Sequence, residues 1–232
     1  MDKKKVLKYY SDEYYRLMYG LHPDMSAAVS YDKAERFLNR FAIDDNYRIR
    51  ECMRSMEEVF AWPINSPFDI ENESPENLFK RGFRLFAHLS TPLFTEEHFK
   101  LIKDIGNTMG DKWLYVIEEC NEENSAIAFK LQLPIDISWD ELADGGFISD
   151  VLLNMYHNNY FLFGDSGKWG RWCDYENSWM DYEIFGYNEE CVAVEAYRQW
   201  CSLTKEEYKD LQDDSRMPNT LQRIEWARSC ER

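Results

Sequence analysis

The sequence predicts an α+β fold: an antiparallel sheet of about five strands with helices packed on one side of it, and a helical N-terminal region. Apolar residues recur every three or four positions in some segments, which is typical of amphipathic helices. In other segments apolar and polar residues alternate, which is typical of strands with one buried and one wet face. With 232 residues, 44 % of them hydrophobic, the chain can bury a sizeable core.

Three helices are expected in the N-terminal part of the chain. The apolar repeat runs over residues 2–21, then about 32–41, then about 45–60. A stretch rich in proline, asparagine and serine follows at residues 61–76 and is the clearest break in the pattern.

This break predicts the domain organisation. We expect a helical region at residues 1–60 packed on the remainder, a Pro-rich loop at 61–76, and an α+β domain at 77–232. Trp62 and Phe68 within the loop favour an ordered segment over a free linker.

Cap residues predict two helices at the start of the α+β domain. Ser74 as the cap and Pro75 at the first helical position predict a helix over about 75–89. Thr95, followed by two glutamates, predicts another over about 95–109.

Further helices are expected later in the chain. Ser138 and Glu141 spell a capping box for a short helix. Apolar spacing or capping predicts the others, at about 147–156, at 188–200, after Thr204 and at 221–227.

Five strands are expected. Residues 112–119 and 126–133 read as a hairpin, because apolar and polar residues alternate and a polar turn separates the two runs. Residues 160–163, 169–175 and 180–185 form an antiparallel meander with a wet face and a buried face.

The first turn of this meander is the tetrad Gly164, Asp165, Ser166 and Gly167. Asp and Ser side chains bond nearby backbone amides, and a glycine takes the positive φ that closes a turn. The same letters surround the nucleophile of trypsin-like serine proteases, which also need a histidine base held by a carboxylate. None of the four histidines lies in a matching context, so we interpret the tetrad as a structural turn.

An acidic, aromatic stretch follows the turn. Between Trp172 and Tyr197 there are seven acids and no lysine or arginine, with aromatic residues interleaved. Aromatic side chains supply contact area and acids attract a basic partner. The alternative is that the aromatics are core and the acids a solvated face. The candidate partner-binding residues are Trp172, Asp174, Tyr175, Glu176, Trp179 and Asp181.

Charge and hydropathy exclude several classes of function. With 43 acids against 27 bases, the net charge is −16, which argues against nucleic-acid binding and is compatible with a basic protein partner. No run approaches the roughly 18 apolar residues that span a bilayer. The N-terminal lysines precede no apolar signal region, so we expect a cytoplasmic protein.

No cofactor or metal motif is present in the sequence. The chain has no P-loop, no G-x-G-x-x-G after a strand and no H-E-x-x-H. The six cysteines form no C-x-x-C pair, so we expect free thiols that pack as small hydrophobic residues.

The central segment resembles part of the small bacterial immunity-type proteins that neutralise polymorphic toxins. The resemblance covers about 30 residues, Asn159 to Tyr187, and rests on a Tyr-Phe-x-Phe-Gly-Asp-x-Gly-Lys-Trp-Gly string followed by an acidic aromatic strand ending Ile-x-Gly. It implies a protein without catalytic residues that covers the active or substrate-binding surface of a toxin.

The leading hypothesis is therefore a non-catalytic binding protein for a basic toxin or nuclease. One alternative is an adaptor or regulatory protein that uses the sheet as a platform, and another is a homo-oligomer. A third is an acid/base hydrolase with paired carboxylates, for which Glu118 with Glu119, or Asp174 with Asp181, are the first candidates.

Overall fold

The structure is a computed structural model that describes residues 1–11, 27–61, 77–90, 94–120, 125–154, 159–174 and 181–201. Within these residues it contains one six-stranded sheet and seven helices, so the α+β prediction is confirmed with one strand more than expected. The strands are β1 (Arg84–Ser90), β2 (Trp113–Glu118), β3 (Lys130–Pro134), β4 (Tyr160–Gly164), β5 (Trp169–Asp174) and β6 (Asp181–Tyr187).

Every strand pairs antiparallel with its neighbours, in the order β1-β6-β5-β4-β2-β3. The expected meander β4–β5–β6 forms the centre of the sheet. The hairpin β2–β3 joins it through β4, and β1 closes the opposite edge through β6.

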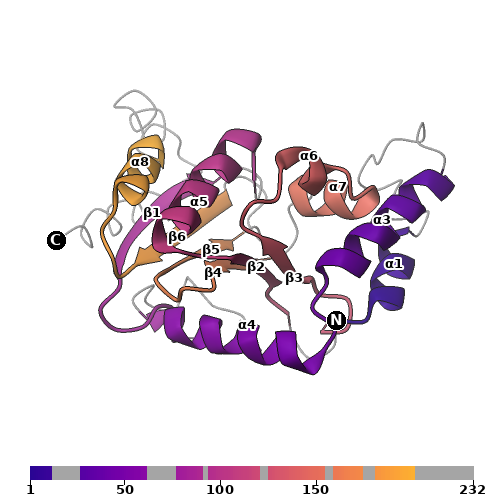
Figure 1. Cartoon of the computed structure of the whole chain (residues 1–232), viewed down its shortest axis with the longest axis horizontal. Coiled ribbons are helices and arrows are strands. Elements are labelled where there is room, and N and C mark those ends of the chain that lie inside the picture. Colours follow the sequence, from indigo (N-terminus) through magenta and orange to yellow (C-terminus); the bar gives the residue numbers. More distant parts are fainter. Residues whose placement is uncertain are drawn as a thin grey trace, which may run out of the picture.

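Helices cover both faces of the sheet. They are α1 (Lys3–Ser11), α3 (Ala27–Phe41), α4 (Asn46–Val59), α5 (Glu96–Met109), α6 (Trp139–Ala143), α7 (Phe147–Asn154) and α8 (Val192–Cys201). Figure 1 shows α4 on one side of the sheet and α5, α6 and α7 on the opposite side. Side chains of α1, α3 and α8 belong to the core on that second side. The prediction that helices occupy one side only is therefore wrong.

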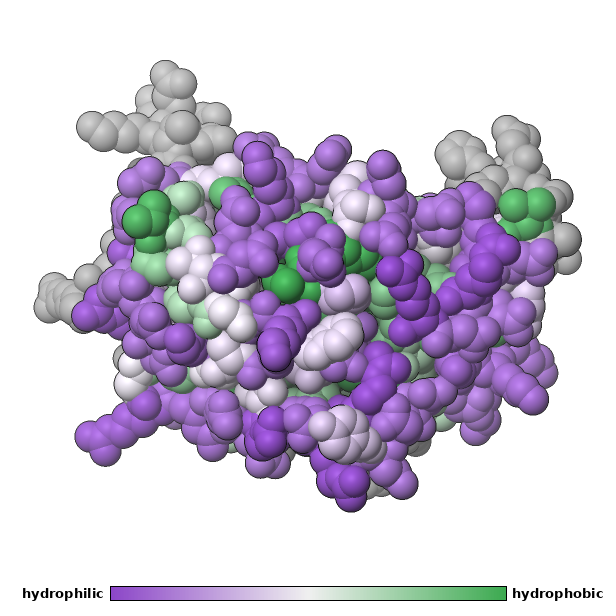
Figure 2. Space-filling model, in the orientation of Figure 1, coloured by the Kyte–Doolittle hydropathy of each residue, from purple (hydrophilic) through white to green (hydrophobic). Residues whose placement is uncertain are grey.

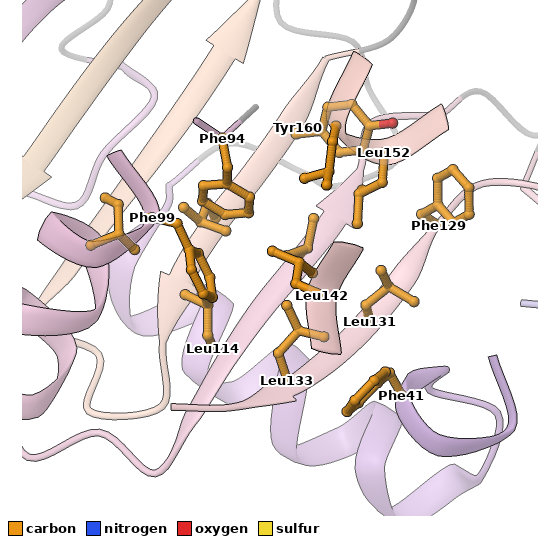
Figure 3. Close-up of a cluster of buried hydrophobic side chains, with 14 of the residues drawn as sticks. Phe41, Phe94, Phe99, Leu114, Phe129, Leu131, Leu133, Leu142, Leu152 and Tyr160 are labelled. Atoms are coloured by element: carbon orange, nitrogen blue, oxygen red, sulfur yellow. The ribbon is translucent and has the colours of Figure 1, made fainter. Parts of the chain in front are cut away.

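The larger core lies between the sheet and the helices opposite α4. Figure 3 shows Phe41, Phe99, Leu142 and Leu152, from four helices, close to side chains of the sheet. The labelled strand residues in this view are Leu114, Leu131, Leu133 and Tyr160.

The smaller core lies between the sheet and α4. Met56 and Val59 of α4, with Phe60, cover Phe161 and Phe163 of β4. Among the described side chains of the meander the expected wet face is absent, because both alternating sets of β4 side chains are apolar and each finds a helical cover.

A strand, β1, occupies the last six residues, 84–89, of the segment that was expected to be a helix over 75–89. Gly82 has φ of 100°, a left-handed conformation that ends a helical path. From Arg84 on, all seven residues of β1 pair with β6. A local helix signal was overridden because β6 offers hydrogen bonds to the whole segment and both cores receive its side chains, with Leu85 in one and Phe86 in the other.

Local cap signals predicted the starts of two helices well. Thr95 caps α5, and Ser138 with Glu141 forms the capping box of α6. The Asp45 side chain caps α4, a helix that was predicted from its apolar spacing. Gly110, with φ of 86°, ends α5.

Some element boundaries differ from the expected ones. The strand expected from residue 126 begins at Lys130, the helix expected from Asn188 begins at Val192, and β6 continues to Tyr187. The expected helices after Thr204 and at 221–227, the second half of the first helix and most of the Pro-rich loop lie outside the described residues.

Five of the six cysteines are described, and no disulfide joins any two of them. Four of them are buried, namely Cys52, Cys120, Cys173 and Cys201. Among the described helices, none is both long and apolar enough to cross a membrane.

Candidate functional site

The candidate site is an open groove of about 980 Å³ whose floor is α5. Figure 2 shows weakly polar and apolar atoms gathered near the middle of the face on which Figure 1 draws α5, with hydrophilic side chains around them. The residues that line the groove are Thr95, Glu96, Glu97, Phe99, Lys100, Lys103, Asp104, Asn107, Trp139 and Trp200.

The amphipathic pattern of α5 determines which side chains form the floor. Its apolar face, with Ile102, Ile105 and Met109, is buried in the larger core. Polar residues at intervals of three or four positions, from Glu96 to Asn107, therefore face outward along one stripe. Thr95 fixes the start of this stripe, since its hydroxyl accepts a hydrogen bond from the His98 amide.

Two tryptophans from other helices also border the groove. Trp139 is the first residue of α6, and its ring centroid lies 6.0 Å from that of Phe99. Trp200 lies in the last turn of α8, and its ring stacks on His98 with centroids 4.9 Å apart. Both are partly exposed. The groove thus combines residues from three helices that are far apart in the sequence.

One cation of the groove is already engaged within the protein. The Lys103 ammonium donates a hydrogen bond to the Ile137 carbonyl and lies 5.5 Å from the centroid of the Phe99 ring. A cation over an aromatic face is attracted by the ring quadrupole. The aromatic side chains of the groove therefore already favour a positive charge.

The remaining charges of the groove are mainly acidic. Glu96, Glu97 and Asp104 are exposed, and within the described part of the chain they form no ion pair. Lys100 is exposed on the same stripe. The groove thus carries three carboxylates and two ammonium groups.

A buried polar chain runs from the sheet to one of these tryptophans. The Arg171 Nε lies 2.5 Å from a carboxylate oxygen of Glu183, and both side chains are 0 % exposed. Tyr197 donates its hydroxyl hydrogen to the other oxygen of Glu183. The His98 Nε2 lies 2.6 Å from the Tyr197 oxygen, and it is the donor because that hydroxyl has only one hydrogen to give.

This chain orients Trp200. The His98 ring contacts two other rings, with its centroid 5.3 Å from that of Tyr197 and 4.9 Å from that of Trp200, and these two rings lie 6.1 Å apart. Burial, followed by the nearby Glu183 charge, raises the pKa of Tyr197 well above its ordinary value, so the hydroxyl keeps its hydrogen. Because His98, Arg171 and Glu183 are buried, they support the groove rather than contact a ligand in it.

The structure corrects one predicted partner-binding residue. Trp172 is fully buried in the smaller core, because its position in β5 points toward the side that α4 covers. Asp174 and Asp181 lie at the paired ends of β5 and β6, and their side chains are outside the description. Tyr175, Glu176 and Trp179 lie outside the described residues.

The tetrad from Gly164 to Gly167 connects β4 and β5 as a turn. Gly167 has φ of 69°, and its amide donates to the Gly164 carbonyl. The Asp165 carboxylate accepts hydrogen bonds from the amides of Lys112 and Trp113, at 2.7 and 3.0 Å. The turn is thereby attached to the start of β2, which is a structural role.

A second carboxylate attaches the same turn from the other side. Asp111 accepts hydrogen bonds from the Ser166 amide at 2.6 Å and from the Trp169 indole at 2.7 Å. Burial raises the pKa of Asp111, and these two donors oppose the rise. Ser166 thus belongs to the turn, while His98, the histidine whose side chain is described, bonds Tyr197.

The carboxylates of Glu118 and Glu119 are each engaged separately. Glu118 accepts a hydrogen bond from the Phe129 amide at 2.5 Å, and Glu119 accepts one from the Asn159 side chain at 2.8 Å. Consecutive residues of an extended chain point in opposite directions, so the two side chains diverge. Burial raises the pKa of Glu118 to about 7.

Sequence reasoning missed the groove as a site. Its acids at Glu96 and Glu97 were assigned only to the start of a helix, and Trp139 and Trp200 to separate helices. The available signal was an exposed stripe on α5 that no apolar residue occupies, but its neighbours depend on the tertiary fold.

Among the described residues, no cluster of three histidine, cysteine or acidic side chains could hold a metal ion. Comparisons with protein families, with curated proteins and with solved structures find no match to this chain. Function is therefore inferred from the groove and from the charge of the chain.

Proposed function

We propose that the chain is a non-catalytic binding protein of the cytoplasm that captures a basic protein partner and neutralises it by covering its working surface, as an immunity protein does. The observation that carries this proposal is the α5 groove, where aromatic side chains and carboxylates without ion pairs within the described part of the chain lie together. The net charge of −16 adds long-range attraction for the same kind of partner.

Aromatic side chains and carboxylates contribute to the binding of such a partner in different ways. Tryptophan and phenylalanine supply large contact area at a low cost in rotamer entropy. Exposed carboxylates speed the approach of a basic surface and orient it, through fields that salt screens over about 10 Å at 0.1 M. Binding should therefore weaken as the salt concentration rises.

The support beneath the groove favours a binding role as well. Trp200 is stacked on His98, which is hydrogen-bonded to Tyr197. A side chain that is already oriented loses less conformational entropy when a partner arrives. The buried polar chain thus prepares one side of the groove for contact.

The resemblance to immunity-type proteins is the reason for choosing neutralisation among the binding roles. The resembling segment, Asn159 to Tyr187, includes β4, β5 and β6 at the centre of the sheet. The resemblance therefore concerns the framework, while the proposed contact surface lies on α5.

The test begins with three purified baits in lysate of the source cells, at low and at physiological salt. The baits are the wild type, the groove variant Glu96→Gln/Glu97→Gln/Asp104→Asn, and a control with the same change in charge, Asp32→Asn/Glu35→Gln/Glu57→Gln. The control residues are exposed on α3 and α4. Captured proteins are identified by mass spectrometry.

We expect one basic partner that the wild type and the control retain and that the groove variant loses. The partner is then produced with and without the chain, and its toxicity to cells is measured. Suppressed toxicity supports the proposed function. Capture that does not depend on salt, or a bound partner that keeps its full activity, contradicts it and favours the adaptor alternative.

A further inference from the structure

We infer that the α5 groove receives a short helical segment of the partner, about two turns long, that carries two arginine or lysine residues seven positions apart and apolar residues on the side that faces the groove. This inference rests on the proposed function for the existence of a partner. It adds the form of the bound segment and its charge pattern.

The volume of the groove limits the size of its occupant. A helix with its side chains is about 10 Å wide and rises 5.4 Å per turn, so one turn occupies roughly 400 Å³. The groove of about 980 Å³ therefore accommodates about two turns. A segment of this length lying along a helical floor is a common mode of peptide recognition.

The positions of the carboxylates determine the charge pattern. Glu96 and Glu97 lie at the start of α5, and Asp104 lies seven or eight residues further on. At 1.5 Å per residue these acids are about 11 Å apart along the axis. Two cations separated by seven residues of a partner helix span the same distance and can meet both acidic positions.

Lys100 lies between the two acidic positions and determines where along the bound segment a cation is tolerated. Its exposed ammonium repels a cation placed at the middle of the bound segment. Lys103 lies on the same stripe and contributes further positive charge there. A segment with cations at its ends therefore binds better than one with the same cations at its centre.

Apolar contact comes from the aromatic side chains. Phe99 and Trp139 lie against each other, 6.0 Å between centroids, and both line the groove. The partly exposed Trp139 indole, which rests on the buried Phe99 ring, favours aliphatic side chains or the stem of a long basic one. This surface supplies apolar contact area for the bound segment, and the carboxylates fix the position of the segment along the groove.

Two synthetic peptides of twelve residues test the inference. Both contain alanine, leucine and two arginines and carry a fluorescein label, but one has the arginines seven positions apart and the other has them adjacent at the centre. Affinities for the whole chain are measured by fluorescence anisotropy at low salt. We expect the first peptide to bind at least about tenfold more tightly, a difference of 1.4 kcal/mol.

Protein variants locate the site of binding. Trp139→Leu is expected to weaken the first peptide about tenfold, and Glu96→Gln/Glu97→Gln/Asp104→Asn is expected to remove the preference between the peptides. Tyr47→Ala is the control, because Tyr47 is an exposed aromatic residue of α4 on the other side of the sheet. Circular dichroism verifies that each variant is folded. If Trp139→Leu does not fold, the variant Glu96→Gln/Glu97→Gln/Asp104→Asn still tests the site, because it changes no buried side chain.

Three results would overturn the inference: equal affinity for both peptides, equal loss in Trp139→Leu and Tyr47→Ala, or no binding at about 1 mM peptide, which corresponds to about −4 kcal/mol. Capture of the natural partner distinguishes failure of this inference from failure of the proposed function. If Trp139→Leu still captures and neutralises a basic partner, the proposed function stands and the groove is not its site. If the peptides behave as expected but no neutralised partner exists, the groove binds such a segment and the proposed function is wrong.

Discussion

Arg171 and Glu183 form an ion pair in the centre of the protein, with the Arg171 Nε 2.5 Å from the Glu183 carboxylate and both side chains fully buried. The pair joins neighbouring strands β5 and β6, and Tyr197 connects it to α8 through a hydrogen bond to Glu183. Two charges in a dry core are tolerated only when each balances the other and further hydrogen bonds satisfy them. The pair therefore holds sheet and helix in one arrangement.

Glu183→Gln is expected to lower the free energy of unfolding by about 3–5 kcal/mol, because it removes the carboxylate that balances the buried guanidinium. The double variant Arg171→Met/Glu183→Gln should recover at least about half of this loss, since no net charge is then buried. Urea unfolding followed by circular dichroism measures both. Glu51→Gln, which breaks an exposed pair with Arg54, is the control and should cost less than about 1 kcal/mol. If the double variant lost as much stability as the single variants Arg171→Met and Glu183→Gln lose together, the result would contradict this account.

Glu118 is expected to make stability depend on pH. Burial raises its pKa from the ordinary 4.5 to about 7 in the folded protein, so the folded state holds the proton more tightly than the unfolded state does. The stability that protonated Glu118 contributes is present below pH 4.5 and is lost as the pH rises through 7. At 1.36 kcal/mol per pKa unit, the loss is about 3 kcal/mol.

Glu118→Gln should therefore be more stable than the wild type by up to about 3 kcal/mol at pH 8, with a difference near zero at pH 4. Glutamine keeps an oxygen that can accept the Phe129 amide hydrogen bond. Unfolding in urea across this pH range measures the difference, with the exposed Glu57→Gln as a control that should stay within about 0.5 kcal/mol at every pH. A constant difference between Glu118→Gln and the wild type would show that the carboxylate is not the titrating group.

Gly164 and Asp111 should be energetically coupled. A Cβ at Gly164 would lie 2.1 Å from the Asp111 carboxylate, so Gly164→Ala is expected to cost about 2–3 kcal/mol by overpacking. In an Asp111→Ala background this contact is gone, and the same substitution should cost at least about 1 kcal/mol less. Gly82→Ala is the control, because Gly82 has a positive φ but nothing within 4 Å of its Cβ position. Its cost should be equal in both backgrounds, and strict additivity at Gly164 would disprove the coupling.

Much of the fold follows from local sequence. The caps at Asp45, Thr95 and Ser138 depend on side chains that bond their own neighbouring backbone, and the turn at Gly164–Gly167 closes through the Gly167 amide and the Gly164 carbonyl. Such interactions involve few residues and little loop closure, so sequence spacing is enough to identify them. The α+β class and the central meander follow from the same local patterns.

The formation of β1 in place of the last part of the helix expected at 75–89 was decided by the tertiary structure, because only the assembled sheet offers the edge of β6. The burial of Trp172 was decided likewise, since alternation in a strand separates two faces but does not reveal that α4 covers the second. The groove depends on Trp139 and Trp200 meeting α5 from distant parts of the chain. The sequence by itself thus determined the class, the caps and the turns, whereas long-range packing alone decided which polar and aromatic residues remain at the surface to meet a partner.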